Sequence, residues 1–257
     1  MEITNKKIMI TGANRGIGHA FAEACAKEKA HLILAIRKAD DKLIKDLKKL
    51  GASSVEIIEC DLISREGVEA LAKKMNQREI DLLFNNAGQL TGGLIETQPL
   101  DDIYKMFQVN VNALVHLTQS VLPQMIKRKS GKIINHASVS AVMHFPCAST
   151  YAASKAAVWA FTDCIEQELK GTGVSTLCLF TPGIKTRMFD QIDELYSKNI
   201  DVVNDSISPQ EYAQKILNAV KKDWTYLEPK GATGIAFQMA QHFKGIFNWG
   251  VGQKFKR

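Results

Sequence analysis

Short apolar runs alternate with helix-forming runs through most of this sequence, and the alternation leaves few folds open to the chain. The apolar runs cover residues 7–11, 31–36, 55–60, 80–84, 132–137 and 174–180, and residues 224–227 are a candidate for a seventh. Near-continuous apolar runs are typical of buried parallel strands, which must be joined by helical crossovers. The pattern therefore predicts an α/β fold in which right-handed βαβ units build a doubly wound parallel sheet of about seven strands.

The composition fits one ordinary globular domain. Of the 257 residues, 46% are hydrophobic and 23% are charged, which argues against disorder and predicts a single domain over residues 1–257. Neither a secretory signal nor an apolar run long enough to cross a membrane is evident. The five cysteines are odd in number and form no C-x-x-C pair, so we expect a reducing compartment and a cytoplasmic location.

The formal charge of +6 has a modest explanation. Much of the excess lies at Lys42, Lys45, Lys48 and Lys49 on one predicted helix face, and at Lys254, Lys256 and Arg257 near the end. Aromatic residues do not interleave with these cations, so we expect no nucleic-acid partner. A few cations remain for a phosphorylated ligand. His136 and His144 do not form a ligand set, and we expect no metal.

A glycine-rich loop follows the first apolar run. Residues 11–18 read TGANRGIG and lead into an alanine-rich helical stretch. A loop between a strand and a helix points backbone N–H groups and a helix N-terminus at a phosphate group. The G-x-x-x-G-x-G spacing differs from the common dinucleotide fingerprint, and a simple turn is the alternative.

The end of the second run indicates which dinucleotide would bind. An acidic residue at this point would bind the adenosine ribose, but the sequence has Arg37 followed by Lys38. The guanidinium groups of Arg37 and Arg15 suit a 2′-phosphate, which predicts NADP(H). The alternative is that Arg37 is an ordinary exposed cation.

Tyr151 and Lys155 lie four residues apart in a run of good helix formers, so their side chains share one helix face. A nearby ammonium group favours phenolate and would lower the pKa of a tyrosine from about 10. Ser138, at the end of the fifth run, could donate a hydrogen bond to the same reacting oxygen. Alone, the Y-x-x-x-K pair is equally consistent with a surface helix pair.

Five motifs then occur in a fixed order. They are TGANRGIG at 11–18, NNAG at 85–88, Asn110, Ser138 with Tyr151-x-x-x-Lys155, and Pro182-Gly183 with Thr186. Over roughly residues 5–190 the chain resembles the short-chain dehydrogenase/reductase family in its single-domain form, which implies a Rossmann-type fold. The resemblance implies that Tyr151 is the general acid or base, that Lys155 lowers its pKa, and that Ser138 orients the substrate oxygen. Asn110 would help to hold a water that links Lys155 to solvent.

The resemblance also implies a cofactor site. Gly12, Gly16 and Gly18 would line the pyrophosphate, and Asp61 and Leu62 would border the adenine. The ribose of the cofactor would lie along Asn86, Ala87 and Gly88. The carboxamide would meet Ile184 and Thr186. The complete expected set adds Asn14, Arg15, Ile17, Arg37, Tyr151, Lys155, Pro182 and Gly183.

These residues predict an NADPH-dependent enzyme that reduces a ketone or aldehyde, or oxidises the corresponding alcohol. The first alternative is an NADP-binding sensor or scaffold without turnover, and a less favoured one is a sugar-nucleotide epimerase or dehydratase. An apolar substrate is expected near Val142, Met143, Phe145, Gln89 and Leu90. Residues 185–207, and 188–196 above all, would form a lid.

Two expectations concern the rest of the chain. The helices around 100–127 and 151–170 are those through which relatives pair, so we expect a homodimer or higher homo-oligomer, with Leu114, Leu117, Val158, Trp159 and Phe161 as spare apolar residues. Residues 231–257 depart from the family's usual ending. Ile235, Met239, Phe243, Ile246 and Phe247 form a stripe there, which Trp249, Val251 and Phe255 continue. The stripe either packs on the domain or roofs the substrate pocket. The alternative is weak contact with an anionic membrane surface, aided by its flanking cations.

Overall fold

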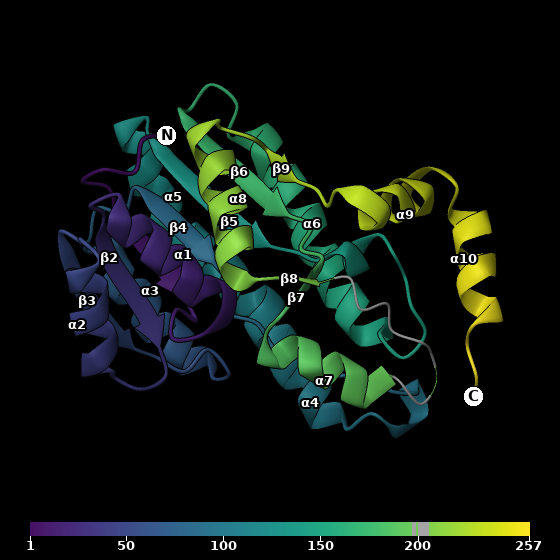
Figure 1. Cartoon of the computed structure of the whole chain (residues 1–257). Coiled ribbons are helices and arrows are strands. Elements are labelled where there is room, and N and C mark those ends of the chain that lie inside the picture. Colours follow the sequence, from purple (N-terminus) through teal and green to yellow (C-terminus); the bar gives the residue numbers. More distant parts are fainter. Residues whose placement is uncertain (197–198, 200–205) are drawn as a thin grey trace.

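The computed structural model describes residues 1–196, 199 and 206–257 (Figure 1). Seven parallel strands form one sheet in the order β3-β2-β1-β4-β5-β6-β9. They are β1 (Lys7–Thr11), β2 (His31–Ile36), β3 (Ser54–Glu59), β4 (Leu82–Asn85), β5 (Gly131–His136), β6 (Val174–Leu179) and β9 (Tyr226–Leu227). This confirms the predicted fold class. Strand order reverses between β1 and β4, and ligands of such sheets bind at the carboxyl ends of the strands beside this point.

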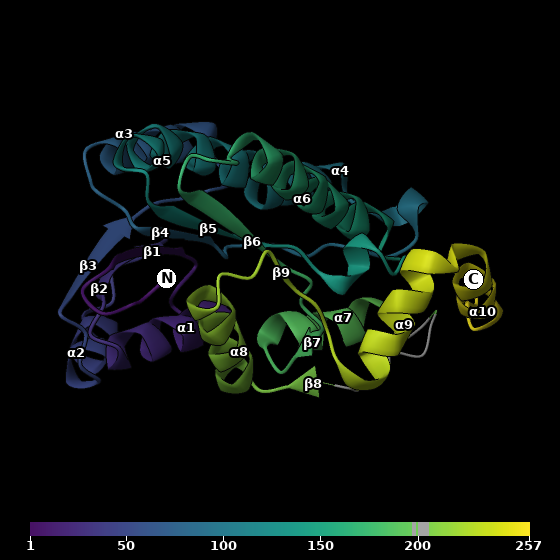
Figure 2. The same ribbon diagram turned by 90° about the horizontal axis from the view of Figure 1, so that it is seen from above.

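Helices cover both faces of the sheet (Figure 2). One layer contains α1 (Gly16–Lys27), α2 (Asp41–Lys49) and α8 (Pro209–Lys221), and the other contains α3 (Arg65–Asn76), α5 (Leu114–Arg128) and α6 (Ser149–Glu168). Buried apolar side chains fill the space on each side, with Phe21, Leu34 and Ile216 in the first layer and Leu71, Leu83 and Leu117 in the second. This core fixes the strand ends that carry the site.

Capping side chains set several helix starts. The side chains of Asp40, Ser64 and Ser208 accept backbone N–H groups at the beginnings of α2, α3 and α8. The start of α1 is different, because Arg15 precedes it and makes no capping side-chain hydrogen bond. The first N–H groups of α1 are therefore left without a side-chain acceptor at the end of the glycine loop.

The long helix predicted over 100–127 is divided. It consists of α4 (Leu100–Phe107), a π-helical segment (Gln108–Ala113) and α5. The π-helical segment contains Asn110, and such segments are frequent at functional sites. The spacing of apolar residues cannot locate a π-helical segment, because the rotation per residue differs only slightly between an α-helix and a π-helix. Short 3₁₀ turns occupy Ile95–Thr97 and Val139–Ala141.

The region after β6 contains a feature that the sequence does not predict. β7 (Gly183–Ile184) pairs with β8 (Ser206–Ile207) in a separate parallel sheet of two strands. Between them, α7 covers Arg187–Tyr196. The predicted lid, 185–207, is described here except for residues 197–198 and 200–205, which lie outside the described part of the chain.

The C-terminal segment forms two helices, α9 (Gly231–His242) and α10 (Lys244–Gln253), which meet at Phe243. Both lie at the end of the molecule opposite α2 and β3 (Figures 1 and 2). Within the described residues, each helix is too short or too polar to cross a membrane.

Candidate active site

The glycine loop leaves room for a ligand backbone. Gly12 and Gly16 have φ angles of +68° and +57°, which favour glycine over residues with a Cβ atom. A Cβ atom at Gly18 would lie 2.4 Å from Nδ2 of Asn86 and 2.7 Å from the Gly12 oxygen. The close approach of backbone to backbone here, together with the uncapped start of α1, forms a cradle of N–H groups suited to a phosphate.

The segment after β4 fixes this loop. The Thr11 hydroxyl accepts hydrogen bonds from the backbone N–H groups of Asn86 (3.0 Å) and Ala87 (2.9 Å). The Asn86 amide nitrogen donates to the backbone oxygens of Thr11 (2.8 Å) and Gly12 (3.2 Å). The NNAG motif and the glycine loop are thus one rigid unit across the switch point of the sheet.

His136 contributes to this site, although the sequence argues against a metal-binding role for it. Its Nδ1 lies 3.3 Å from Oδ1 of Asn86, and its backbone oxygen accepts a hydrogen bond of 2.7 Å from Nζ of Lys155. Burial and the Lys155 charge lower the pKa of His136 to about 3. His136 therefore links the two segments through different atoms, with its neutral ring beside Asn86 and its backbone oxygen on Lys155. Its place two residues before Ser138 was the available signal.

Two arginines remain free beside the cradle. Arg15 and Arg37 are exposed, and in the described part of the chain neither forms an ion pair. Asp40 is the first acidic residue after β2. Its side chain accepts a hydrogen bond from the Leu43 N–H at the start of α2. At the end of β3, Asp61 accepts the Ile63 N–H (3.0 Å), and Leu62 is buried. Arg15 and Arg37 are therefore accessible to an anionic group, and their contact with a 2′-phosphate stays a prediction.

Ser138, Tyr151 and Lys155 lie together, with exposed fractions of 8%, 9% and 5%. β5 leads to Ser138, and the N-terminal half of α6 supplies the other two. A side-chain hydrogen bond joins Ser138 and Tyr151, and Nζ of Lys155 lies 5.7 Å from the centre of the Tyr151 ring. The surface-pair alternative is wrong, because both side chains are buried.

Burial dominates the protonation of this group. It raises the pKa of Tyr151 to about 12, against the opposing effect of the Ser138 hydrogen bond. It also lowers the pKa of Lys155 to about 8. The expected lowering of the Tyr151 pKa by Lys155 is therefore not seen here. The physical reason is that a buried phenolate loses its hydration, while the Lys155 ammonium group donates to the His136 oxygen.

Asn110 is 1% exposed and forms hydrogen bonds with two other segments of the site. Its amide exchanges two hydrogen bonds with the backbone of Gln89, at 2.8 and 2.9 Å, and donates to the hydroxyl of Ser154 at 3.1 Å. A Cβ atom at Gly88 would lie 3.4 Å from Oδ1 of Asn110 and 3.9 Å from Nζ of Lys155. Asn110, Gly88 and Lys155 thus converge, and the water-holding role of Asn110 stays a prediction.

The segment after β6 also reaches the cradle. The methyl group of Thr186 would lie 3.3 Å from a Cβ atom built on Gly16. Ile184 is buried, while Asn14, Pro182 and Gly183 keep some exposure along the same edge. Ile17 is buried at the start of α1. The structure therefore brings together the predicted cofactor residues from all five motifs.

The expected substrate residues divide into two groups. Val142 and Met143 are buried in the core with Phe180 and Phe237, so they pack inside the domain. Phe145 and Leu90 instead pack with Leu94, Leu195, Val251 and Phe255 around Cys147 and Ala148. Gln89 is held through its backbone by Asn110. Apolar side chains from distant segments therefore gather around Cys147 and Ala148, just before the start of α6.

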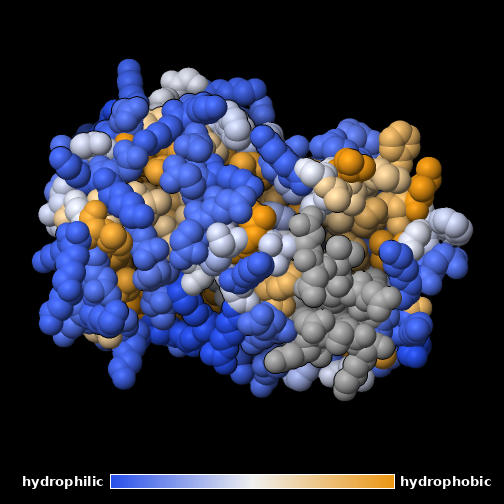
Figure 3. All heavy atoms as spheres, viewed as in Figure 1, coloured by the Kyte–Doolittle hydropathy of each residue, from blue (hydrophilic) through white to orange (hydrophobic). Residues whose placement is uncertain are grey.

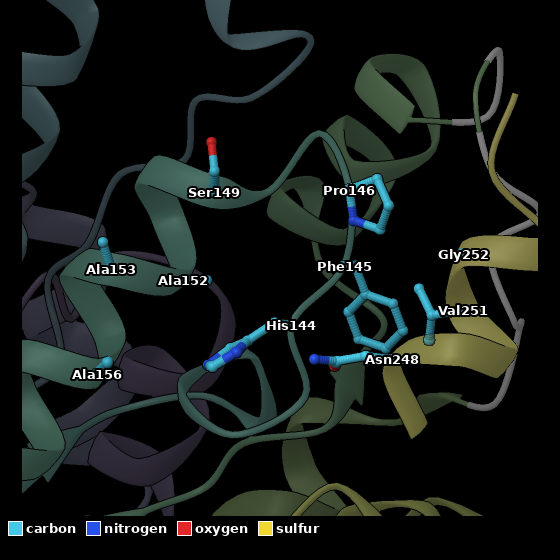
Figure 4. Close-up of a pocket in the computed structure, with 10 residues that line it drawn as sticks. All are labelled: His144, Phe145, Pro146, Ser149, Ala152, Ala153, Ala156, Asn248, Val251 and Gly252. Atoms are coloured by element: carbon cyan, nitrogen blue, oxygen red, sulfur yellow. The ribbon is translucent and has the colours of Figure 1, made fainter. Parts of the chain in front are cut away.

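A groove of about 590 Å³ lies between α6 and α10 (Figure 4). His144, Phe145, Ala152 and Ala156 line one side, and Asn248, Val251 and Gly252 line the other. Within the described part of the chain, its lining does not include Ser138, Tyr151 or Lys155. The groove is therefore separate from these three residues, although Ala152 of its lining follows Tyr151 in α6. The described residues also contain no cluster of three His, Cys, Asp or Glu side chains that could bind a metal ion.

Comparison with known proteins agrees with this geometry. The sequence model of the family described as short chain dehydrogenase matches residues 6–197. The chain belongs to the short-chain dehydrogenase family. It is 30% identical to an uncharacterized oxidoreductase, YusZ, from Bacillus subtilis, over 98% of this chain and 91% of that protein. The resemblance drawn from the motifs is confirmed, and the protein is an oxidoreductase of this family.

Solved structures share the fold of this short-chain dehydrogenase. One from Burkholderia cenocepacia, in complex with NADP, superposes with a TM-score of 0.82 at 22% identity, covering 98% of this chain and 99% of that one. Another, from Sphingobium yanoikuyae in complex with NADPH, gives 0.78 at 23% identity, covering 98% and 97%. The family match ends before α8, α9 and α10 of this short-chain dehydrogenase.

Proposed function

We propose that this short-chain dehydrogenase uses NADP(H) to reduce an apolar ketone or aldehyde, or to oxidise the corresponding alcohol. The observation that carries the proposal is the buried group of Ser138, Tyr151 and Lys155 at the same sheet edge as the glycine cradle. A proton donor, an oxygen-orienting hydroxyl and a phosphate cradle are the parts that hydride transfer to a carbonyl group requires.

The residues present fit NADP(H). The open backbone at Gly12, Gly16 and Gly18 and the uncapped start of α1 suit the pyrophosphate. The free guanidinium groups of Arg15 and Arg37 suit a 2′-phosphate. Both structural neighbours named above contain NADP or NADPH, which supports the same choice here. When bound, NADPH supplies the hydride, and the protein must supply the proton.

We assign the proton to Tyr151. With a pKa of about 12, the phenol is protonated at neutral pH and ready to donate to a carbonyl oxygen. Ser138 donates a hydrogen bond to the same oxygen, and Lys155 places positive charge beside the phenolate that remains. The reverse reaction needs the phenolate, so its rate should rise with pH. The protonation of Tyr151 therefore favours reduction at neutral pH.

Apolar side chains support an apolar substrate. Leu90, Phe145 and Leu195 come from three segments and pack with Val251 of α10. The backbone N–H of Lys256 donates to the backbone oxygen of Asn199 at 2.8 Å. The side-chain amide of Asn199 in turn donates to the backbone oxygen of Lys256, also at 2.8 Å. We propose that α7 covers the substrate and that the end of the chain holds this cover in place through Asn199.

A panel of ketones and aldehydes with NADPH tests the activity. We expect loss of absorbance at the reduced nicotinamide band with apolar carbonyl compounds, and slower turnover with small, strongly polar ones. NADPH binding without turnover of any panel member would contradict the enzymatic proposal and favour a sensor.

Assembly is a separate proposal. Leu114, Leu117 and Val158 are buried in their own chain, with exposed fractions of 5%, 1% and 0%, so they are not available to a partner as the sequence suggested. Trp159 packs on Phe180, with ring centres 5.4 Å apart. The outer face of α6 instead presents small residues, which let two helices approach closely.

We expect a two-fold symmetric homodimer through the outer faces of α5 and α6. Light scattering at micromolar protein should give close to twice 28.5 kDa. Ala160→Arg should shift the mass toward the monomer, because Ala160 is exposed on α6, whereas Ala70→Arg on α3 should not. A monomeric wild-type protein would refute the proposal.

A further inference from the structure

The C-terminal helices expose a large apolar surface that the proposed function does not use. Ile235, Met239, Phe243, Ile246 and Trp249 are 68%, 39%, 61%, 60% and 70% exposed. We call these five residues the α9–α10 surface. Apolar side chains gather over the part of the molecule that α9 and α10 occupy (Figure 3). Contiguous exposed apolar residues of this kind mark interaction sites.

Other residues already attach these helices to the domain. Phe237 of α9 is 1% exposed and packs on Phe180, with ring centres 5.0 Å apart. Phe247 of α10 contacts Phe145 at 5.9 Å, and Val251 packs with Leu195. The predicted stripe is therefore divided. Phe247, Val251 and Phe255 turn inward, and the α9–α10 surface is left over, so folding of this chain does not account for it.

The charge of the same segment points to one kind of partner. Residues 229–257 contain Lys230, Lys244, Lys254, Lys256 and Arg257 and no Asp or Glu, a formal charge of +5. All five cations are exposed, and Arg257 pairs with Glu96. Exposed aromatic and aliphatic side chains flanked by cations suit an anionic bilayer surface.

A second copy of the chain fits less well. A two-fold contact through this surface would bring together two segments that each carry these cations, and like charges across an interface are unfavourable. An anionic surface instead complements the four lysines, which are exposed. The position of α9 and α10 at one end of the molecule leaves them accessible to a flat surface (Figures 1 and 2).

We propose that the α9–α10 surface docks this protein on anionic lipid bilayers. The apolar side chains enter the headgroup boundary, and the flanking cations contact lipid phosphates. Binding of this kind combines buried apolar area with electrostatic attraction and weakens as salt screens the charges. It is independent of the proposed reaction.

Co-sedimentation of the full chain with vesicles tests this proposal. One set of vesicles is phosphatidylcholine alone, and the other contains about a third of phosphatidylglycerol. We expect binding to the second set, weaker at about 0.5 M salt than at about 0.1 M. The triple variant Ile235→Ser, Ile246→Ser, Trp249→Ser should lose binding. Its matched control, Ile95→Ser, Leu100→Ser, Tyr104→Ser, changes three exposed apolar residues elsewhere and should bind normally.

Two charge-reversal variants test whether the bilayer attracts the cations of the C-terminal segment or only the net positive charge of the whole protein. Lys244→Glu with Lys254→Glu should weaken binding at least about tenfold, because each cation near an anionic surface contributes about fivefold. Lys45→Glu with Lys48→Glu changes the net charge equally on α2 and should have little effect.

Three results would overturn the proposal. The first is failure of the wild-type protein to bind anionic vesicles at low salt. The second is equal binding by the triple serine variant. The third is a loss of oligomeric mass in the triple serine variant, which would assign the surface to a second copy.

Discussion

Tyr151→Phe is expected to reduce kcat by roughly a hundredfold or more, the usual scale for a positioned acid or base. The substitution removes one hydroxyl group and leaves the buried ring in place, so folding and NADPH affinity should change little. The remaining turnover would have to take its proton from water, in a site where Tyr151 is only 9% exposed. Steady-state kinetics with the best carbonyl substrate and fluorescence titration with NADPH measure the two quantities.

Tyr212→Phe is the matched control. Tyr212 is 2% exposed, and its hydroxyl forms a hydrogen bond of 2.9 Å with Thr181 in the core. Removing this hydroxyl should cost about 1 kcal/mol of unfolding free energy and leave kcat within a few-fold of wild type. If Tyr151→Phe kept a large share of wild-type turnover, the proton would have to come from another group.

Arg37→Asp is expected to weaken NADPH binding by about tenfold to about a hundredfold. A charge-assisted contact to a 2′-phosphate contributes about 1.5–3 kcal/mol, and each 1.4 kcal/mol is about a tenfold change in affinity. The new carboxylate would repel that phosphate, whereas the ribose hydroxyls of NADH could donate to it. Affinity for NADH should therefore stay the same or improve.

The readout is kcat/KM with each cofactor, measured on wild type, Arg37→Asp and Lys45→Asp. The last variant makes the same change of net charge on α2 and should keep the wild-type preference for NADPH. Because Arg37 forms no ion pair within the described residues, its loss should leave the fold intact. A wild-type enzyme with equal kcat/KM for NADPH and NADH would rule out the assigned preference.

The sequence determined the fold and much of the candidate site, because both follow from local patterns. Buried parallel strands must be apolar, so runs such as 31–36 and 132–137 were visible directly. The order of the motifs then placed Gly12, Asn86 and Ser138 after β1, β4 and β5, and parallel strands bring such points to one edge.

Other features depended on contacts between residues far apart in the sequence. The partner of Lys155 is the backbone oxygen of His136, nineteen positions away, and no spacing rule predicts it. The pKa of Tyr151 is raised by burial, although its neighbour Lys155 predicted a lower value. Burial is a property of the packed molecule, and it outweighed the local charge.

The same reason explains why the sequence could not settle which apolar faces are free. Periodicity identifies a stripe such as Ile235 to Phe247 but does not say which part of the stripe meets the domain. In the folded chain Phe237, which lies outside that stripe, packs on Phe180, whereas Ile235 and Ile246 remain exposed. Leu114 and Val158, expected to be spare, are buried in their own chain. The sequence by itself determined the strands, the loop chemistry and the family. Only the tertiary structure decided which apolar side chains are left for a partner, because that depends on what already covers them.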